Sequence, residues 1–402
     1  MTPSRSLRHL LPALCAAVVL FSAPSARAAD AWLMTYGTAD RVEERFGHNA
    51  LWIRDPARGV DRIYNFGFFD FDTPDFYLDY LFGDLIYFAV ARDPAEELSY
   101  YRWRDRSVRA QRLDLDDATI RRLTDWLDTR VAPENRNFRY DYYLNNCSTR
   151  IRDALDYALD GALRDATFDA PAGQTFREHT RRLMRPDPLL YLAVQAALGR
   201  GVDRPPSVWD EMFLPEIVAD VAATLQLSDG EGGTRPLVVD DRMLHVSERP
   251  KPAASPGFPW SPVLIVLAAG LALLLVPYAS FRGRGAALAG WRIWLLLNAL
   301  GGGLLLFLWL ATDHVAAGAN ENVLLINPLF ALLWRARGGR FEGWVAATLF
   351  GMLVSTLVLK LFGTPQWNFD LLLAVLPVQL VALGLWRRAS RSYRPPPLYG
   401  TQ

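Results

Sequence analysis

The stretch NNCSTR, residues 145–150, contains Cys147, one of only two cysteines in the 402-residue chain. After it, apolar residues recur at helical spacing until Gly161, a residue that commonly ends helices. This pattern predicts that Cys147 lies in the first turn of a helix. The unpaired N–H groups and the dipole at a helix N-terminus favour a thiolate, so the position indicates a thiol that ionises easily.

The first 28 residues have the pattern of a secretory signal peptide. Two arginines precede an apolar run over residues 10–23, and ARA at residues 26–28 supplies a cleavage site after Ala28. An uncleaved first transmembrane helix is the alternative. Both interpretations place the following domain outside the cytoplasm.

Export makes the number of cysteines informative. The second cysteine, Cys15, lies within the signal segment, so Cys147 has no disulfide partner in the mature chain. Structural cysteines of exported proteins usually occur as disulfides. The lone thiol of Cys147 is therefore either incidental or reactive.

The last third of the chain has the composition of a membrane domain. Five apolar segments, most close to the ~20 residues that a spanning helix needs, occupy residues 263–279, 291–311, 315–334, 344–362 and 369–386. The third is the least apolar, because it contains residues 320–322 (NEN) and the pair Asn327-Pro328. The pattern predicts a membrane domain of about five transmembrane helices.

The distribution of arginine predicts the orientation of these helices. Arginines gather after the first, third and fifth segments, and the other loops carry almost none. By the positive-inside rule, the exported domain then stays outside and the C-terminus is cytoplasmic, as in a multi-pass membrane protein. Lysine plus arginine and aspartate plus glutamate number 43 each, so no bulk charge attracts nucleic acid.

These patterns predict an α+β exported domain followed by an all-α membrane domain. The expected parts are a signal peptide (1–28), a catalytic domain (29–160), a mostly helical extension (161–246), a proline- and serine-rich linker (247–262), the transmembrane domain (263–386) and a cytoplasmic tail (387–402).

Within the exported domain, residues 31–36, 46–54 and 60–67 are predicted to be strands, the last two joined by a turn at residues 55–59. If Ile53 lies opposite Val60, His48 lies opposite Asn65, on the same face of the sheet. Residues 102–115 indicate another strand pair, and residues 116–130 an amphipathic helix.

Aromatic residues crowd the segment from Tyr64 to Phe88. They form either the core of the domain or an apolar wall for acyl chains near the membrane, which would make Tyr64 and Phe66 substrate-binding residues. The predicted orientation also places His314 and Asn320 at the outer face, on the same side as Cys147. These polar groups either contact substrate, as Asn146 would beside the thiol, or form a simple interfacial loop.

A cysteine at a helix start and a histidine on a strand form the thiol–imidazole arrangement of papain-like enzymes. The imidazole of His48 would take the proton of Cys147, and the thiolate would attack a carbonyl group. His48 precedes Cys147, the reverse of the order in papain, so the expected fold is circularly permuted. Asn65 is the candidate for orienting the imidazole.

Three motifs carry a resemblance to a known family. FGHNALWI (46–53), YNFGFFDF (64–71) and NCSTRIRD (146–153) resemble the exported domain of the Lnb family of bacterial lipoprotein N-acyltransferases. PENR (133–136), MFLP (212–215) and the order of signal, exported domain and membrane helices are also similar to that family. The resemblance implies that His48 and Cys147 are the catalytic pair, whereas Asn65 rests on the strand pairing.

The resemblance also implies an acyl transfer in two steps, without metal or cofactor. Cys147 would take a fatty acyl group from a membrane phospholipid as a thioester, and the N-terminal amine of a diacylated lipoprotein would then accept it.

Two other functions fit the residues. One is a papain-like cysteine hydrolase that cuts lipid esters or cell-wall peptides. The other is a non-catalytic, membrane-anchored binding protein in which Cys147 has no chemical role.

Overall fold

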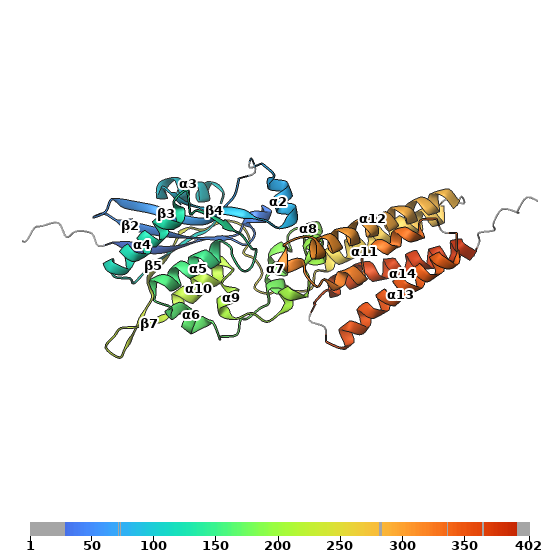
Figure 1. The fold of residues 1–402 in the computed structure, drawn as a ribbon. Helices are drawn as coiled ribbons and strands as arrows, with labels where there is room; N and C mark the ends of the chain where they lie inside the picture. The colour runs from blue at the N-terminus through green and yellow to red at the C-terminus, as the bar shows by residue number, and fades with distance from the viewer. Residues whose placement is uncertain are drawn as a thin grey trace, which may run out of the picture.

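The computed structural model describes residues 29–70, 72, 74–280, 284–335, 337–363 and 366–391. The predicted signal peptide and residues 392–402 of the predicted tail lie outside this range. Figure 1 shows a mixed α/β part joined end to end with a bundle of long helices. This arrangement confirms the predicted combination of an α/β N-terminal region and a helical C-terminal region.

One seven-stranded antiparallel sheet forms the centre of the α/β part, with the strand order β6-β4-β3-β2-β1-β5-β9. The predicted strands at residues 31–36, 46–54 and 60–67 are confirmed. The strands are β1 (Asp30–Tyr36), β2 (His48–Asp55), β3 (Val60–Phe68), β4 (Ile86–Arg92), β5 (Val108–Leu113), β6 (Asn137–Arg139) and β9 (Val238–His245). A separate hairpin pairs β7 (Gln226–Ser228) with β8 (Thr234–Pro236).

Helices cover both faces of this sheet. The helices of the α/β part are α2 (Phe76–Phe82), α3 (Pro94–Trp103), α4 (Asp117–Val131), α5 (Cys147–Ala158), α6 (Ala162–Thr167), α7 (Phe176–Met184), α8 (Pro188–Ala197), α9 (Val208–Glu211) and α10 (Pro215–Thr224), with short 3₁₀ helices η2 (Val42–Glu44) and η3 (Arg200–Asp203). Helix α3 packs on one face of the sheet and α4, α5 and α10 on the other. The predicted helix at residues 116–130 is confirmed as α4, and the Asp116 side chain accepts a hydrogen bond from the N–H of Thr119 at its start.

Because side chains alternate along a strand, each strand contributes to two cores. Leu33, Leu51 and Tyr64 pack with α4, α5 and α10 on one face. Tyr36 and Ile63 pack with Tyr101 of α3 on the other face. The sheet therefore separates α3 from α5, and only residues near the ends of the strands can bring the two sides together.

Two predictions for this part are wrong. Residues 102–115 do not form a strand pair, because α3 extends to Trp103 and only β5 follows. The predicted extension at 161–246 is helical only as far as α10, after which β7, β8 and β9 follow. Strand β9 pairs with β5, more than a hundred residues earlier in the chain, so no local sequence pattern predicts this pairing.

Four helices are long and apolar enough to span a membrane in the described part of the chain. They are α11 (Trp260–Ser280), α12 (Arg284–Leu310), α13 (Arg340–Leu361) and α14 (Phe369–Arg391). They form the bundle of long helices, coloured yellow-orange to red, in Figure 1.

The helix expected at residues 315–334 is replaced by three short 3₁₀ helices, η4 (Val315–Ala317), η5 (Glu321–Leu324) and η6 (Pro328–Leu333). The side chains of Asn320 and Asn327 accept backbone N–H groups two residues ahead, so each asparagine caps the start of a new short helix, η5 and η6 respectively. The segment packs against α12 and α13 and reaches Trp334, whose carbonyl accepts a hydrogen bond from Arg292. Arg292 lies 18 residues before the end of α12, a distance of about 27 Å along the helix.

The two parts of the protein are joined where α8 ends. The carbonyl groups of Gln195, Ala196 and Ala197 accept hydrogen bonds from the side chains of Asn320 and Asn322. Carbonyls at a helix C-terminus have no partner within the helix, so asparagines of the bundle satisfy them.

Buried Arg177 of α7 strengthens the same junction. It forms an ion pair with Asp203 at 2.7 Å and donates to the carbonyls of Leu198 and Gly199. Asp203 also accepts the N–H of Trp367, at the start of the last helix of the bundle. The ion pair of Arg177 and Asp203 therefore connects the α/β part to the bundle.

We expect Arg177→Met to destabilise the protein by about 3–5 kcal/mol, because Asp203 would keep a buried charge without its partner. Arg58→Met is the matched control, since Arg58 pairs with Asp125 at 2.7 Å on the exposed surface, where a pair contributes about 1 kcal/mol or less. Thermal unfolding of the full chain in detergent would compare them. Equal shifts in melting temperature would contradict a structural role for the buried pair.

Candidate active site

Cys147 is the first residue of α5, as the sequence predicts. Asn146 caps this helix: its Oδ1 accepts the N–H of Thr149, while the Thr149 hydroxyl accepts the N–H of Asn146. The Asn146 Nδ2 donates to the carbonyls of Tyr142 and Phe213. This reciprocal cap fixes where the helix begins, and with it the position of the thiol.

The half-buried thiol lies against the end of β3, where the strand bulges between Phe66 and Phe68. Gly67 at this bulge has φ +94°, and a Cβ added there would lie 3.4 Å from Cys147 Cβ and 3.7 Å from the Tyr140 ring. Glycine adopts this φ without strain, and a side chain at the bulge would be in van der Waals contact with Cys147. The backbone N–H of Asn49, the residue after His48, is directed at the thiol and lowers its pKa.

His48 begins a chain of buried hydrogen bonds. Its Nε2 lies 2.9 Å from Asn65 Oδ1, and Asn65 Nδ2 donates to Glu97 Oε2 at 2.8 Å. Glu97 Oε1 in turn accepts the hydroxyl of Tyr36 at 2.5 Å, and the Tyr36 ring stacks on His48. This chain connects β1, β2, β3 and α3.

The chain fixes the tautomer of the imidazole. Because Glu97 and the carbonyl of Ile63 both take hydrogens from Asn65 Nδ2, the amide presents its oxygen to His48. His48 Nε2 must then carry the hydrogen, which leaves Nδ1 with the free electron pair. The imidazole is thus prepared to accept a proton at Nδ1.

The predicted register is wrong by two residues, but the predicted partner of His48 is confirmed. Val60 lies opposite Asp55 rather than Ile53, and Asn65 opposite Ala50. His48 lies two residues before Ala50, on the same face, so it reaches Asn65 diagonally. A shift by an even number of residues preserves the face of every side chain.

Burial favours the neutral forms of both His48 and Cys147. It lowers the pKa of His48 to about 4, against a smaller opposite effect of the bond to Asn65. Burial also raises the pKa of Cys147, although hydrogen bonds to Ser148 and the N–H of Asn49 oppose it. The prediction of an easily ionised thiol is therefore wrong: loss of hydration outweighs the helix N-terminus.

Glu97 was missed by the sequence analysis. It is almost fully buried, and burial raises its pKa to about 7. It lies on α3, 32 residues beyond Asn65, in a segment with no recognisable motif. A buried carboxyl group with a perturbed pKa near a candidate catalytic histidine is a common sign of a functional site. Only the folded structure shows that Glu97 lies close to His48, because the two are connected through Asn65.

The other predicted site residues lie in different surroundings. Tyr64 and Phe66 are buried on the opposite face of the sheet, where the Tyr64 hydroxyl donates to Asp128. Asn146 serves the helix cap and Asn320 the end of α8. His314 stacks on Tyr142, with 6.1 Å between the ring centroids, in the segment that leads to Cys147.

A family comparison bears on this site. The model of the Lnb N-terminal periplasmic domain matches residues 23–182. The N-terminal region belongs to the Lnb family. The match includes Cys147, His48, Asn65 and Glu97, and it ends within α7, before the membrane bundle. No curated protein and no solved structure matches the chain.

The neutral pair predicts a distinct pH dependence for alkylation of Cys147 in this Lnb-family domain. Only the thiolate reacts, so with a raised pKa the rate with iodoacetamide should rise about tenfold per pH unit between about pH 6 and 8. Mass spectrometry of the Cys147 peptide would follow the reaction, with a free peptide thiol as reference. A rate that is constant below pH 7 would indicate a preformed thiolate–imidazolium pair and contradict this assignment.

Proposed function

We propose that the chain is a membrane-anchored acyltransferase that completes the N-terminus of diacylated lipoproteins. One observation carries the proposal. Cys147, at the start of α5, accepts a hydrogen bond from the backbone N–H of Asn49, the residue after His48, and both lie within the part of the chain that matches the Lnb domain. We further propose that the domain is a circularly permuted papain-like fold.

In the first step, Nδ1 of His48 takes the thiol proton of Cys147, and sulfur attacks an ester carbonyl of a phospholipid. The Nε2–H bond to Asn65 supports the imidazolium that forms. Collapse of the intermediate breaks the ester C–O bond, and His48 returns the proton to the departing lysophospholipid oxygen. The acyl group remains on Cys147 as a thioester.

In the second step, the α-amine of a diacylated lipoprotein attacks the thioester carbonyl. The C–S bond breaks, an amide forms, and the amine proton returns through His48 to the thiol. Neither step needs an oxidant, a nucleotide or a metal ion.

Attachment to the bundle supports this reaction, because donor and acceptor are both anchored in a membrane. We propose that the chain lies in the bacterial inner membrane with the Cys147 domain on the periplasmic side and the C-terminus in the cytoplasm. The arginines between α11 and α12, before α13 and at the end of α14 support this orientation.

Cys147→Ala should abolish triacylation of lipoproteins, since the thioester cannot form. In cells whose only candidate N-acyltransferase is this protein, mass spectrometry of lipoprotein N-terminal peptides would count the acyl chains. Cys15→Ala is the matched control, because it makes the same substitution in the predicted signal peptide and should leave triacylation intact.

The outcomes separate the alternatives. Unchanged triacylation with Cys147→Ala would exclude the thioester mechanism. Diacylated peptides with the wild type, together with Cys147-dependent release of fatty acid, would indicate a hydrolase. Neither product with the wild type would favour a binding protein.

Asn65→Ala should lower kcat by at least about tenfold with little change in KM, because Asn65 orients the imidazole and does not bind substrate.

Glu97→Gln should also lower kcat and shift the pH profile of kcat, since it removes the group whose pKa is about 7. Asp128→Asn is the control: Asp128 accepts the buried Tyr64 hydroxyl on the opposite face. Equal kcat losses with Asp128→Asn would reduce the role of Asn65 and Glu97 to stability.

A further inference from the structure

Helix α2 is apolar except for Asp79 and buries none of its residues. Its seven residues read FYLDYLF, and Tyr77, Leu78 and Phe82 are 72%, 55% and 46% exposed. In water, such a helix would gain little from folding, since short helices are stabilised by packing an apolar face. An exposed apolar surface of this kind indicates contact with something that the structure does not contain.

The C-terminal end of α2 is attached to the membrane bundle. The Phe82 carbonyl accepts the N–H of Asp313, and the Tyr80 carbonyl lies 3.1 Å from His314 Nε2. Gly83, with φ +83°, packs so closely that an added Cβ would lie 2.8 Å from the His314 nitrogen. Helix α2 therefore has a fixed position beside the end of α12.

This position corresponds to the outer surface of the bilayer. The Phe82 ring meets the Phe307 ring of α12 at 5.5 Å. Phe307 lies three residues before the end of α12, about 4.5 Å along the helix axis, so it is at the boundary of the apolar layer. Exposed Leu310 and Val315 continue the apolar surface from α12 to α2. The surface that would surround α12 thus extends over α2, which identifies a lipid leaflet as its partner.

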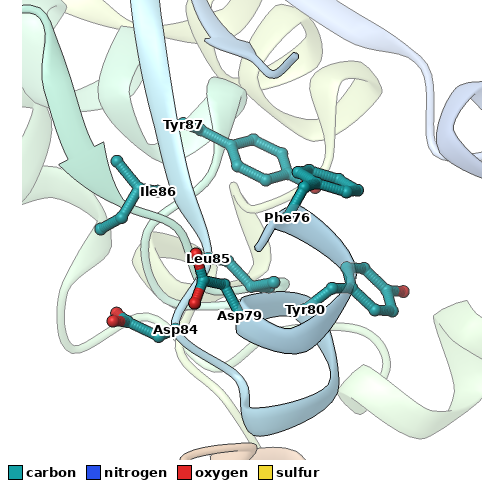
Figure 2. A pocket seen from close by; sticks show the side chains of 7 residues that line it. All are labelled: Phe76, Asp79, Tyr80, Asp84, Leu85, Ile86 and Tyr87. Atoms are coloured by element: carbon teal, nitrogen blue, oxygen red, sulfur yellow. The ribbon is translucent and has the colours of Figure 1, made fainter. Parts of the chain in front are cut away.

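A hollow lies on the inner side of α2. Figure 2 shows its lining, in which Phe76 of α2 lies next to Tyr87 of β4, and Asp79 lies beside Leu85; Tyr80, Asp84 and Ile86 complete the lining. The lining is mostly apolar and aromatic, but the hollow has a volume of only about 40 Å³, so it is a small surface depression that does not enclose an acyl chain.

Aromatic rings connect this hollow with the thiol. Tyr87 stacks on Tyr140 with 4.2 Å between ring centroids, and Tyr140 lies beside Cys147 at Gly67. Tyr142, on the same segment, stacks on His314 at the membrane end. The hollow therefore lies between the membrane boundary and Cys147.

We propose that α2 lies in the outer leaflet as an interfacial helix, and that the small hollow beside it marks where the acyl chain of a membrane lipid enters toward Cys147 when the surrounding aromatic rings move apart. The position in the leaflet depends only on the apolar surface. The role of the hollow rests on the proposed acyl transfer. The aromatic and leucine side chains of α2, with no basic residue among them, fit the acyl and glycerol region rather than anionic headgroups.

Fluorescence quenching would test the position of α2 in the full chain. Leu78→Cys in a Cys15→Ala, Cys147→Ala background would carry an environment-sensitive label, with the protein in phosphatidylethanolamine–phosphatidylglycerol nanodiscs. We expect several-fold stronger quenching by lipids with a nitroxide near the glycerol than at Trp103→Cys. Trp103 is the matched control, being apolar and 76% exposed on α3, which packs on β3 and β5. Equal quenching at the two positions would overturn the inference.

Acyl transfer would test the hollow. In a chain that keeps Cys147, Tyr87→Ala should lower the rate of Cys147 acylation by vesicle phospholipid several-fold, while its alkylation by iodoacetamide stays unchanged. Unchanged acylation would exclude this route even where Leu78 is quenched. Unchanged triacylation of lipoproteins with Cys147→Ala would instead overturn the proposed function, and the quenching result would stand independently.

Discussion

The carbonyl end of α8 is the constraint on which the position of the site depends. Its last carbonyls have no helical partner, and Asn320 and Asn322 of the broken segment between α12 and α13 provide the donors. From there, packing continues to the thiol: Phe176 of α7 contacts Tyr143 and Phe213, and the Phe213 carbonyl accepts the Asn146 side chain. The cap that positions Cys147 is therefore linked to the membrane bundle through a continuous buried path.

The need to pair buried backbone polar groups also explains how residues 315–334 can be non-helical. A non-helical backbone at membrane depth is tolerated where protein groups satisfy its polar atoms. Asn327 Nδ2 donates to the Val323 carbonyl, and Gln379 of α14 donates to the Leu325 carbonyl. The asparagines that make this segment the least apolar in the sequence are thus the groups that stabilise its broken conformation and attach the α/β part.

Local patterns predicted those parts of the site that local forces determine. A capping residue and helical spacing place Cys147 at the start of α5, and alternation along β2 and β3 places His48 and Asn65 on one face. The register was wrong by two residues because the turn, not the face, sets it. Glu97 and Tyr36 could not be found in this way, since α3 and β1 meet Asn65 only in the folded sheet. The acidity of the thiol also depends on burial, which a sequence motif does not contain.

A neutral thiol–imidazole pair has consequences for the choice between amine and water. The low pKa of His48 makes its imidazole a weak base, so the resting thiol keeps its proton until a carbonyl group is bound. Water needs a general base to attack a thioester, and such an imidazole activates it poorly. A neutral amine attacks without prior loss of a proton. In the proposed mechanism, the burial that disfavours the thiolate of Cys147 would therefore slow base-assisted attack of water on the thioester more than attack of a neutral amine.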